Sequence, residues 1–245
     1  EKVIISQEKI APNIIQVYKN QKLNKKYKLV AEVRSAPEKK FVVPKLTSVK
    51  ISSKNALNEH HIRVSIPHLK TEIPLFIVFK ALGCDSDKEI CYYVLNNDNS
   101  KLDKTMLQIL GPSIIEGSDM KTQVDAITFM SKHINSSNST INNTEEIKFN
   151  YIKNTVLKDL IPHEYKYVNK CYYLGLMVQK LLKCHLSIDH LDDRDSYMSK
   201  RVETCGSLIG NLLSQAIVRL SREIKTNIIL LNRVIFTLSG WSKLV

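Results

Sequence analysis

The sequence lacks the short motifs of phosphate-binding and nucleophilic enzymes. It has no P-loop, no GxGxxG fingerprint and no protein-kinase motif set, and Ser207 lies in GSLIG, which departs from the GxSxG nucleophile turn. There is no CxxC pair, and the odd set of five cysteines favours reduced thiols over a disulfide framework. These cysteines are Cys84, Cys91, Cys171, Cys184 and Cys205. Phosphate-cradle enzymes and disulfide scaffolds therefore have no support.

Long apolar stretches are also absent. Runs such as 73–79 and 228–231 fall well short of the roughly 20 residues that a membrane-spanning helix needs. Residues 1–7 alternate in the manner of a strand and do not form an apolar signal region. We therefore expect no membrane partner, and a nuclear or cytoplasmic setting, or a virion, in place of secretion. A chain that begins inside a longer protein would fit the same observation.

Positive charge is abundant and unevenly placed. The 245 residues carry a net charge of +12, and residues 1–50 alone hold 12 Lys or Arg against 4 Glu. A concentrated basic surface attracts nucleic-acid phosphates and releases counterions, so binding should weaken with added salt. The competing interpretation is a solvated, lysine-rich face. The 29 lysines also fit the bias of an A+T-rich coding sequence, which weakens the inference of nucleic-acid binding from charge alone.

The first third of the chain predicts β-structure and the remainder predicts helices. Short runs rich in Val, Ile and Tyr, separated by turn residues, occur at 3–6, 14–18, 27–34, 41–52 and 61–66. The apolar run 75–82 fits a strand or a buried helix equally well. Ser86 and Glu89 have the spacing of a capping box, which predicts a helix that starts there and buries Ile90 and Val94. Further helices are predicted at 101–110, 122–134 and 145–160. Strands followed by helices indicate an α+β fold.

A dense group of charges, LDDRDSYMSKR at 191–201, separates two apolar helical patterns. The pattern at 171–186 predicts a buried face, and the pattern at 208–220 repeats it. We expect a fixed corner in which the aspartates cap the second helix and form ion pairs with nearby bases. The residues of this ion-pair corner are Asp192, Asp193, Arg194 and Asp195. Clustered carboxylates could also hold a cation, but no glycine-punctuated calcium loop surrounds them, so we predict no metal site.

The run from 192 to 220 resembles the DDRD-x4-KR-x4-G-x-L segment of the second-largest subunit of multisubunit DNA-directed RNA polymerases of the eukaryotic, archaeal and large-DNA-virus type. Other similar stretches follow in the same order. They are EKVIISQEKIAPN at 1–13, VAEVRSA at 30–36, IRVSIPHLKTEIPLFIVFKALG at 62–83, LIPH at 160–163 and YYLGLMVQKLL at 172–182. The resemblance covers residues 1–225, whereas 228–245 does not match the segment expected next.

This resemblance implies a lobe inserted into a protrusion, with protrusion at 1–20, lobe at 21–198 and protrusion return helices with a divergent tail at 199–245. It implies one wall of a DNA cleft that acts in transcription without catalytic residues of its own. The expected partners are the largest subunit, other polymerase subunits, DNA and initiation factors. The chain needs no cofactor, because the resemblance assigns the catalytic magnesium of this nucleotidyltransferase to an aspartate motif of the largest subunit.

Seven basic residues are candidates for contact with DNA. They are Lys200, Arg201, Arg34, Lys22, Lys25, Lys26 and Lys28. Arg201 could equally pair with the aspartates of the corner. Two alternatives for the whole chain stay open, namely a standalone basic nucleic-acid-binding module and a truncated copy that acts as a structural interaction protein. Tyr92-Tyr93 and Tyr172-Tyr173 could stack on bases, although core packing is the commoner role of such residues.

Overall fold

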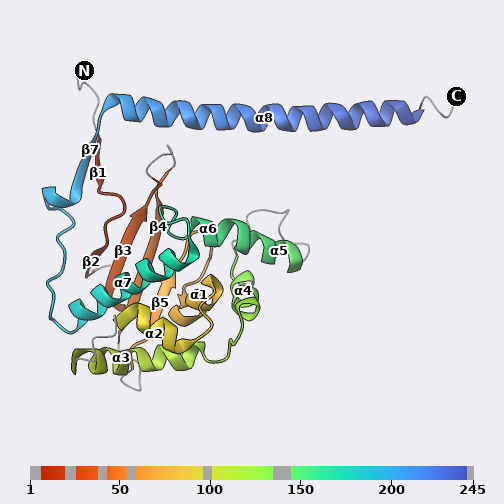
Figure 1. The fold of residues 1–245 in the computed structure, drawn as a ribbon. Coiled ribbons are helices and arrows are strands. Elements are labelled where there is room, and N and C mark those ends of the chain that lie inside the picture. The colour runs from red at the N-terminus through yellow and green to blue at the C-terminus, as the bar shows by residue number, and fades with distance from the viewer. Residues whose placement is uncertain are drawn as a thin grey trace. The chain divides into compact units, whose positions relative to one another are not determined.

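The computed structural model describes residues 7–19, 26–37, 43–53, 59–95, 101–134 and 145–241 (Figure 1). The chain divides into two compact units. The larger unit is Ile10–Lys200, and the smaller unit combines Glu1–Lys9 with Arg201–Val245. Both ends of the sequence therefore belong to one unit, and the intervening residues form the other.

An antiparallel sheet with the order β2-β3-β4-β5-β6 organises the larger unit. Val17 of β2 pairs with Ala31 of β3, and Ala31 pairs in turn with Val49 of β4. All three side chains are buried, as expected for β-branched and small residues at the centre of a covered sheet. The strands are β2 (Gln16–Tyr18), β3 (Tyr27–Ser35), β4 (Lys45–Ser52), β5 (Ile62–Ser65) and β6 (Ile73–Pro74). These bounds confirm the predicted strands from residue 14 onward, whereas the strand predicted at 3–6 lies outside the described residues.

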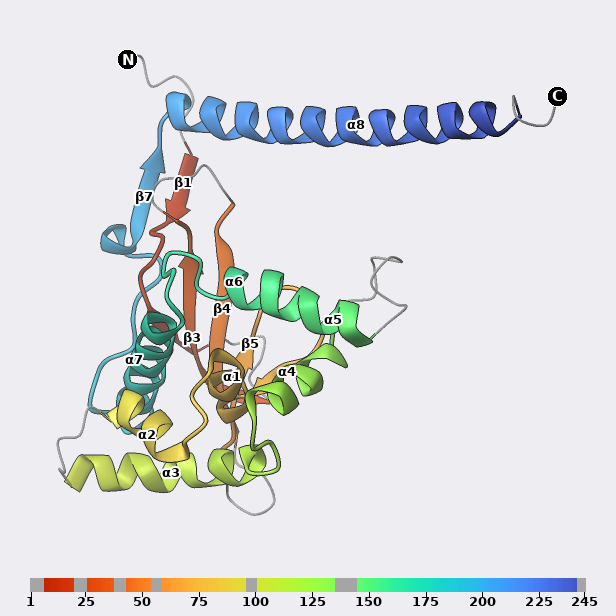
Figure 2. The same ribbon diagram turned by 45° about the vertical axis from the view of Figure 1, so that its right-hand side comes forward.

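Helices follow the strands along the chain and cover the sheet (Figure 2). The helix α7 packs on β3 and β4, and α1 packs on β5 and β6. The helices of this unit are α1 (Leu75–Leu82), α2 (Asp87–Leu95), α3 (Lys101–Gly117), α4 (Gln123–Ser131), α5 (Glu145–Tyr151), the π-helical turn η2 (Ile152–Val156), α6 (Leu157–Asp159), α7 (Tyr167–His185) and the 3-10 turn η3 (Tyr197–Ser199). The α+β class predicted from the sequence is confirmed.

The run 75–82, which periodicity left open, is a helix. All eight of its residues are buried, so no polar face marks a helical period, and Gly83 ends the helix in the left-handed region at φ 104°. The predicted helix at 145–160 is present with a π-helical turn inside it. Its Ile152 and Val156 are buried, whereas Ile147 is exposed.

Two lysines are buried in the larger unit, and both have satisfied ammonium groups. Lys80 of α1 donates to the carbonyl oxygens of Gly117 and Met120 at 3.0 and 2.9 Å and forms a salt bridge with Asp87. Lys170 of α7 donates to three carbonyl oxygens at 2.6–2.9 Å. These acceptors replace the water that each ammonium loses on burial, so the two lysines join neighbouring helices and add nothing to the basic surface.

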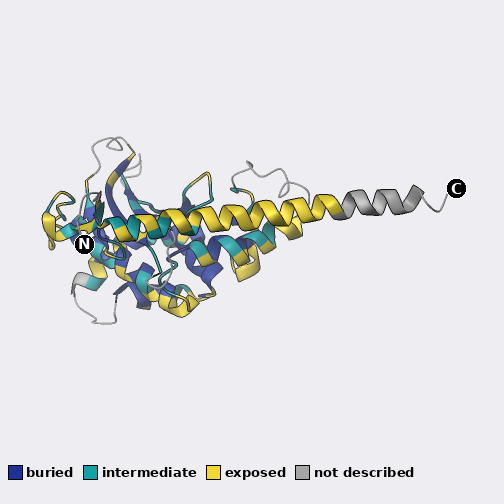
Figure 3. Ribbon diagram, turned by 90° about the horizontal axis from the view of Figure 1, so that it is seen from above, coloured by how far each residue is buried: buried dark blue, intermediate teal, exposed yellow. Residues whose placement is uncertain are grey.

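The smaller unit contains all but one residue of each of two paired strands, β1 (Gln7–Ile10) and β7 (Lys200–Glu203), and the long helix α8 (Cys205–Trp241). The predicted burial of the apolar pattern at 208–220 is wrong in this chain. Ile209, Leu212, Leu213, Ile217 and Leu220 are all exposed (Figure 3). The pattern specifies a helix with an apolar stripe, but burial also requires a partner, and the described residues of this unit provide none. No described helix combines the length and the hydropathy that a membrane crossing needs.

The tight crossing of α2 and α7 depends on Gly175. A Cβ added to Gly175 would lie 2.7 Å from the carbonyl carbon of Tyr93 and closer still to its oxygen. Because the obstacle is backbone, Gly175→Ala must move one helix away from the other. We expect a loss of about 1–3 kcal/mol in the free energy of unfolding, measured by urea denaturation.

Gly111→Ala in α3 is the matched control, because a Cβ at Gly111 meets no atom within 4 Å. It should change stability by less than about 1 kcal/mol, since the gain in helix propensity is opposed by Pro112, which restricts the residue before it. Equal losses in the two variants would contradict the close approach at Gly175.

Candidate nucleic-acid interface

Three of the candidate DNA-contacting residues, Lys26, Lys28 and Arg34, lie on or beside the β2-β3 hairpin. Lys28 and Arg34 are exposed on β3, at positions where the strand leaves its otherwise buried pattern. Lys26 is exposed immediately before this strand, whereas Lys22 and Lys25 lie outside the described residues. The hairpin therefore presents basic side chains from a rigid strand, which is a favourable support for phosphate contacts.

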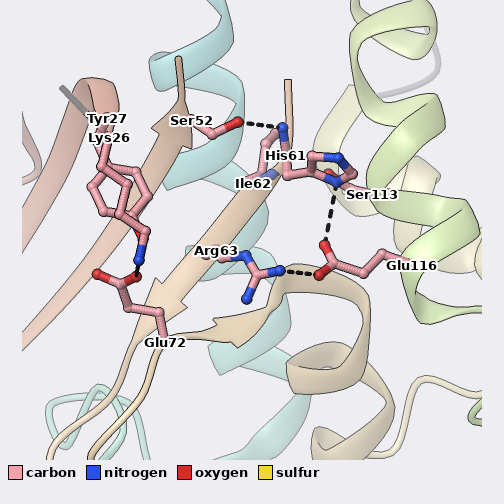
Figure 4. A network of polar contacts seen from close by, with 9 residues as sticks. All are labelled: Lys26, Tyr27, Ser52, His61, Ile62, Arg63, Glu72, Ser113 and Glu116. Atoms are coloured by element: carbon pink, nitrogen blue, oxygen red, sulfur yellow. Dashed lines mark hydrogen bonds and ion pairs between the residues drawn. The ribbon is translucent and has the colours of Figure 1, made fainter. Parts of the chain in front are cut away.

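Lys26 takes part in a polar network around Glu72 (Figure 4). The Lys26 ammonium lies 3.5 Å from one Glu72 oxygen and 5.2 Å from the centre of the Tyr27 ring, and Tyr27 donates its hydroxyl hydrogen to Glu72. Lys50 of β4 donates to the other Glu72 oxygen at 2.8 Å. Burial lowers the pKa of Lys50, and the adjacent positive charge of Lys26 lowers it further. Sequence reasoning missed Lys50, because nothing in the local pattern brings β4 beside Glu72.

A second network in Figure 4 joins β5 to α3. Arg63 forms a salt bridge with Glu116, and the His61 ring nitrogen lies 3.4 Å from the other oxygen of the same carboxylate. The Ser113 hydroxyl accepts a hydrogen bond from the Ile62 amide at 2.9 Å. Arg63 is therefore committed to structure within the described part of the chain.

Arg34 and Arg194 lie near Glu32 and Tyr18. Arg34 Nε is 3.3 Å from Glu32, and the Arg194 guanidinium lies 4.4 Å from the centre of the Tyr18 ring. Tyr18 donates its hydroxyl hydrogen to Glu32. Burial and then this hydrogen bond raise the pKa of Tyr18 to about 12. Arg194 thus packs over an aromatic ring of β2, a cation–π contact that the sequence pattern did not indicate.

The aspartates of the acidic corner have separate roles. Asp192 accepts a hydrogen bond from the Val17 amide at 2.7 Å and pairs with Lys180 at 2.7 Å, while its own amide donates to the Val17 carbonyl at 2.8 Å. Asp193 accepts from the Asp195 amide at 2.9 Å in a local turn. The prediction that these aspartates cap the following helix is wrong, because α8 begins only at Cys205, after β7.

Lys200 and Arg201 stand at the boundary of the two units, in β7. Lys200 is half-buried and lies 3.9 Å from the Asp195 carboxylate, which is 96% exposed. Arg201 is exposed. Within the smaller unit, Lys9 of β1 forms a salt bridge with Glu203 of β7 and ties the two strands together.

The described residues contain no group of three or more His, Cys, Asp or Glu side chains arranged to hold a metal ion. The cysteines are free thiols, and the Sγ atoms of Cys84 and Cys171 lie 3.1 Å apart in the core. The tyrosine pairs divide between two environments. Tyr93 is buried and Tyr173 is half-buried, whereas Tyr92 and Tyr172 are about half exposed.

Comparison with known proteins identifies the family of the chain. Residues 11–203 match the model of the family "RNA polymerase Rpb2, domain 2". The chain belongs to this family. It is thus related to the second-largest subunit of RNA polymerase, as the sequence resemblance indicated, and the matched region contains the sheet, the helices that cover it and the acidic corner.

Several relatives align with most of the chain. DNA-directed RNA polymerase II subunit 2 of Arabidopsis thaliana is 33% identical over 92% of the chain. The RPB2 subunit of RNA polymerase II from Encephalitozoon cuniculi is 35% identical over 86%, and RNA polymerase subunit 2 of Acanthamoeba polyphaga mimivirus is 29% identical over 88%. The chain spans only 18–19% of the length of these three relatives. The family assignment thus concerns one region of a much longer type of protein.

Asp192 should contribute far more to stability than the other acids of the corner. Asp192→Ala removes the acceptor for the buried Val17 amide and the partner of Lys180, so we expect a loss of about 1–3 kcal/mol in the free energy of unfolding. Asp195→Ala, at an exposed site, should stay within about 0.5 kcal/mol. Urea denaturation of both variants measures the difference, and similar midpoints would show that Asp192 is not the structural acid.

Proposed function

We propose that the chain is the lobe, with adjoining protrusion segments, of a second-largest subunit of DNA-directed RNA polymerase, and that it forms one wall of the DNA cleft during transcription. The family match over residues 11–203 is the observation that carries this proposal. In this interpretation the lobe corresponds to 21–198, and the flanking segments 1–20 and 199–245 belong to the protrusion. The largest subunit, other polymerase subunits and DNA are the proposed partners, and initiation factors contact the outer face.

The proposed contribution of the chain to nucleotidyl transfer is positional and electrostatic. The magnesium-dependent chemistry belongs to the complete assembly, and no residue of this chain takes part in it. The corner residues instead support the β2-β3 hairpin, because Asp192 and Arg194 both contact β2. A wall that guides DNA needs such rigid support, since a loosely held cation loses side-chain entropy each time it binds a phosphate.

The basic hairpin is the proposed DNA-facing element. Lys28 is exposed and forms no hydrogen bond or ion pair with another described residue, so its ammonium is available for phosphate. Arg34 and Lys26 each share an acidic partner, and phosphate would compete with that partner. Contacts of this kind are independent of sequence and favour any duplex that enters the cleft.

The principal alternative is a standalone nucleic-acid-binding module. Affinity purification of the tagged chain from its own cells separates the two proposals. Recovery of a largest-subunit chain in stoichiometric amounts supports the polymerase proposal. Salt-sensitive DNA binding by the chain alone, without recovery of that subunit, would favour the standalone module. A stable chain that binds neither would favour the third interpretation, a truncated copy with a structural role.

Neutralising the basic hairpin should flatten the salt dependence of DNA binding. In the variant, Lys22, Lys25, Lys26 and Lys28 are replaced by Gln. If all four contact phosphate, the slope of log K against log salt concentration should fall by up to about 4, because each neutralised phosphate contributes about 0.9. Fluorescence anisotropy with a labelled duplex measures the slope, and the melting temperature should change by no more than about 1–2 °C for these surface substitutions.

The matched control removes the same number of charges from the helical part. Lys104, Lys121, Lys132 and Lys166 are all exposed, and their replacement by Gln also lowers the net charge from +12 to +8. This control should keep the parental slope. A slope that falls equally in both variants, or in neither, would contradict a specific DNA-contacting role for the hairpin.

A further inference from the structure

A pocket of about 330 Å³ opens between the end of α2 and the first half of α7. Tyr93 of α2 and Tyr172, Tyr173 and Leu176 of α7 line it, together with Glu164 from the segment before α7. The two helices lie side by side in Figures 1 and 2. No residue of the proposed DNA-contacting hairpin lines this pocket, so it requires a separate explanation.

The tyrosine rings are held in fixed positions. Tyr93 donates its hydroxyl hydrogen to Glu89 at 2.8 Å, and Tyr173 donates to the carbonyl oxygen of Asn13 at 3.0 Å. Tyr172 meets Tyr93 edge to face, with the ring centres 4.6 Å apart. Burial raises the pKa of Tyr173 to about 12 and also raises that of Tyr93, so both rings stay neutral. The pocket therefore has preorganised aromatic walls.

Glu164 gives the pocket a negative charge. The Asn169 side chain donates to one Glu164 oxygen at 3.0 Å, and no described residue donates a hydrogen bond to the other oxygen. Two lysines of the adjoining helix are committed elsewhere, and Lys166, just before the helix, is exposed and does not line the pocket. Lys170 donates to backbone carbonyls, and Lys180 pairs with Asp192. A carboxylate beside aromatic rings, with no lysine or arginine lining the pocket, would repel phosphate and attract a cation.

An exposed apolar stripe continues from the pocket along α7. Val168, Tyr172 and Leu176 are spaced four residues apart, which places them on one helical face, and they are 55%, 49% and 49% exposed. Tyr165, just before the helix, is 72% exposed. Isolated exposed apolar side chains are ordinary, but a row of them beside an acidic pocket is typical of a protein-binding surface.

We propose that this surface binds a segment of a partner protein that inserts one arginine side chain into the pocket. The guanidinium meets the Glu164 carboxylate and stacks on the tyrosine rings, and apolar residues on either side of the arginine pack on Val168 and Leu176. Arginine suits the pocket better than lysine, because its planar, weakly hydrated cation both stacks on rings and pairs with carboxylates. This proposal rests on residues other than the basic hairpin, so it stands or fails independently of DNA binding.

Labelled helical peptides with a leucine and alanine surface and one central arginine test the proposal. The control peptide carries citrulline, which keeps the shape of arginine without its charge. Fluorescence anisotropy with the whole 245-residue chain should give at least about tenfold tighter binding of the arginine peptide, as expected for one charge-assisted contact beside aromatic rings. Equal binding of the two peptides, or no binding of either, would overturn the proposal.

Variants of the chain locate the contact. Glu164→Gln should abolish the preference for arginine over citrulline, whereas Glu145→Gln, an identical change at an exposed site in α5, should keep it. Leu176→Ser should weaken both peptides to a similar degree. Unchanged urea midpoints establish that the variants are folded. An arginine site at Glu164 would be refuted if Glu164→Gln kept the preference. It would also be refuted if a DNA duplex displaced the arginine peptide from both the parent chain and the hairpin variant.

Discussion

The larger unit depends on the way Asp192 completes the free edge of its sheet. The strand β2 is the first strand in the order, so its outward amide and carbonyl groups have no neighbouring strand. Asp192 meets both groups of Val17, accepting with its carboxylate and donating with its own amide. A strand from another chain could not pair with this edge at Val17, because both outward groups of Val17 are already used. The same carboxylate pairs with Lys180, so one side chain joins the sheet edge, the acidic corner and α7.

Several other features follow from this attachment. With residue 192 held beside Val17, Arg194 lies over Tyr18, and Tyr18 in turn donates to Glu32 beside Arg34. The basic side chains of β3 are therefore flanked by an ordered cluster of mixed charge. The number of basic residues in the sequence therefore differs from the number that a ligand can reach. Lys80 and Lys170 are used inside the fold, and Arg63 pairs with Glu116, whereas Lys28 is exposed and has no such partner among the described residues.

Hydrophobic periodicity in the sequence predicted the helices that have a clear 3.6-residue pattern. It did not predict which helical faces are buried, because periodicity does not show what packs against them. The buried face of α7 is confirmed at Leu174, Val178 and Leu181, because a strong 3.6-residue pattern has one interpretation. For 75–82 the pattern could not separate strand from helix, since seven of the eight positions are apolar and Lys80 is buried with them. Along α8 the helical pattern was interpreted correctly, but the burial was not. Burial depends on whatever packs against the stripe, and periodicity does not contain that information.

The candidate site was also predicted only in part from the sequence. Charge density indicated the hairpin and the acidic corner, but three neighbouring aspartates could not be assigned separate roles from their order alone. Only the approach of β2 makes Asp192 a structural acid and leaves Asp195 in solvent. Lys50 and Glu72 are 22 residues apart, and their ion pair arises from the meeting of two segments that no local motif connects. Long-range pairing of this kind decides which charges a ligand can reach.

Two surfaces of opposite charge on one unit have a consequence for recognition. A polyanion drawn to the hairpin gains from every free lysine there, whereas the Glu164 pocket disfavours it, so a nucleic acid would not spread evenly over this basic chain. A basic protein segment has the opposite preference. Charge of the wrong sign excludes a competitor, just as charge of the right sign attracts a partner. Under the two proposals above, DNA and an arginine-bearing protein would therefore be directed to different surfaces with few specific contacts. The net charge of +12 alone would conceal this separation. It arises partly because Lys170 donates to backbone carbonyls and Lys180 pairs with Asp192.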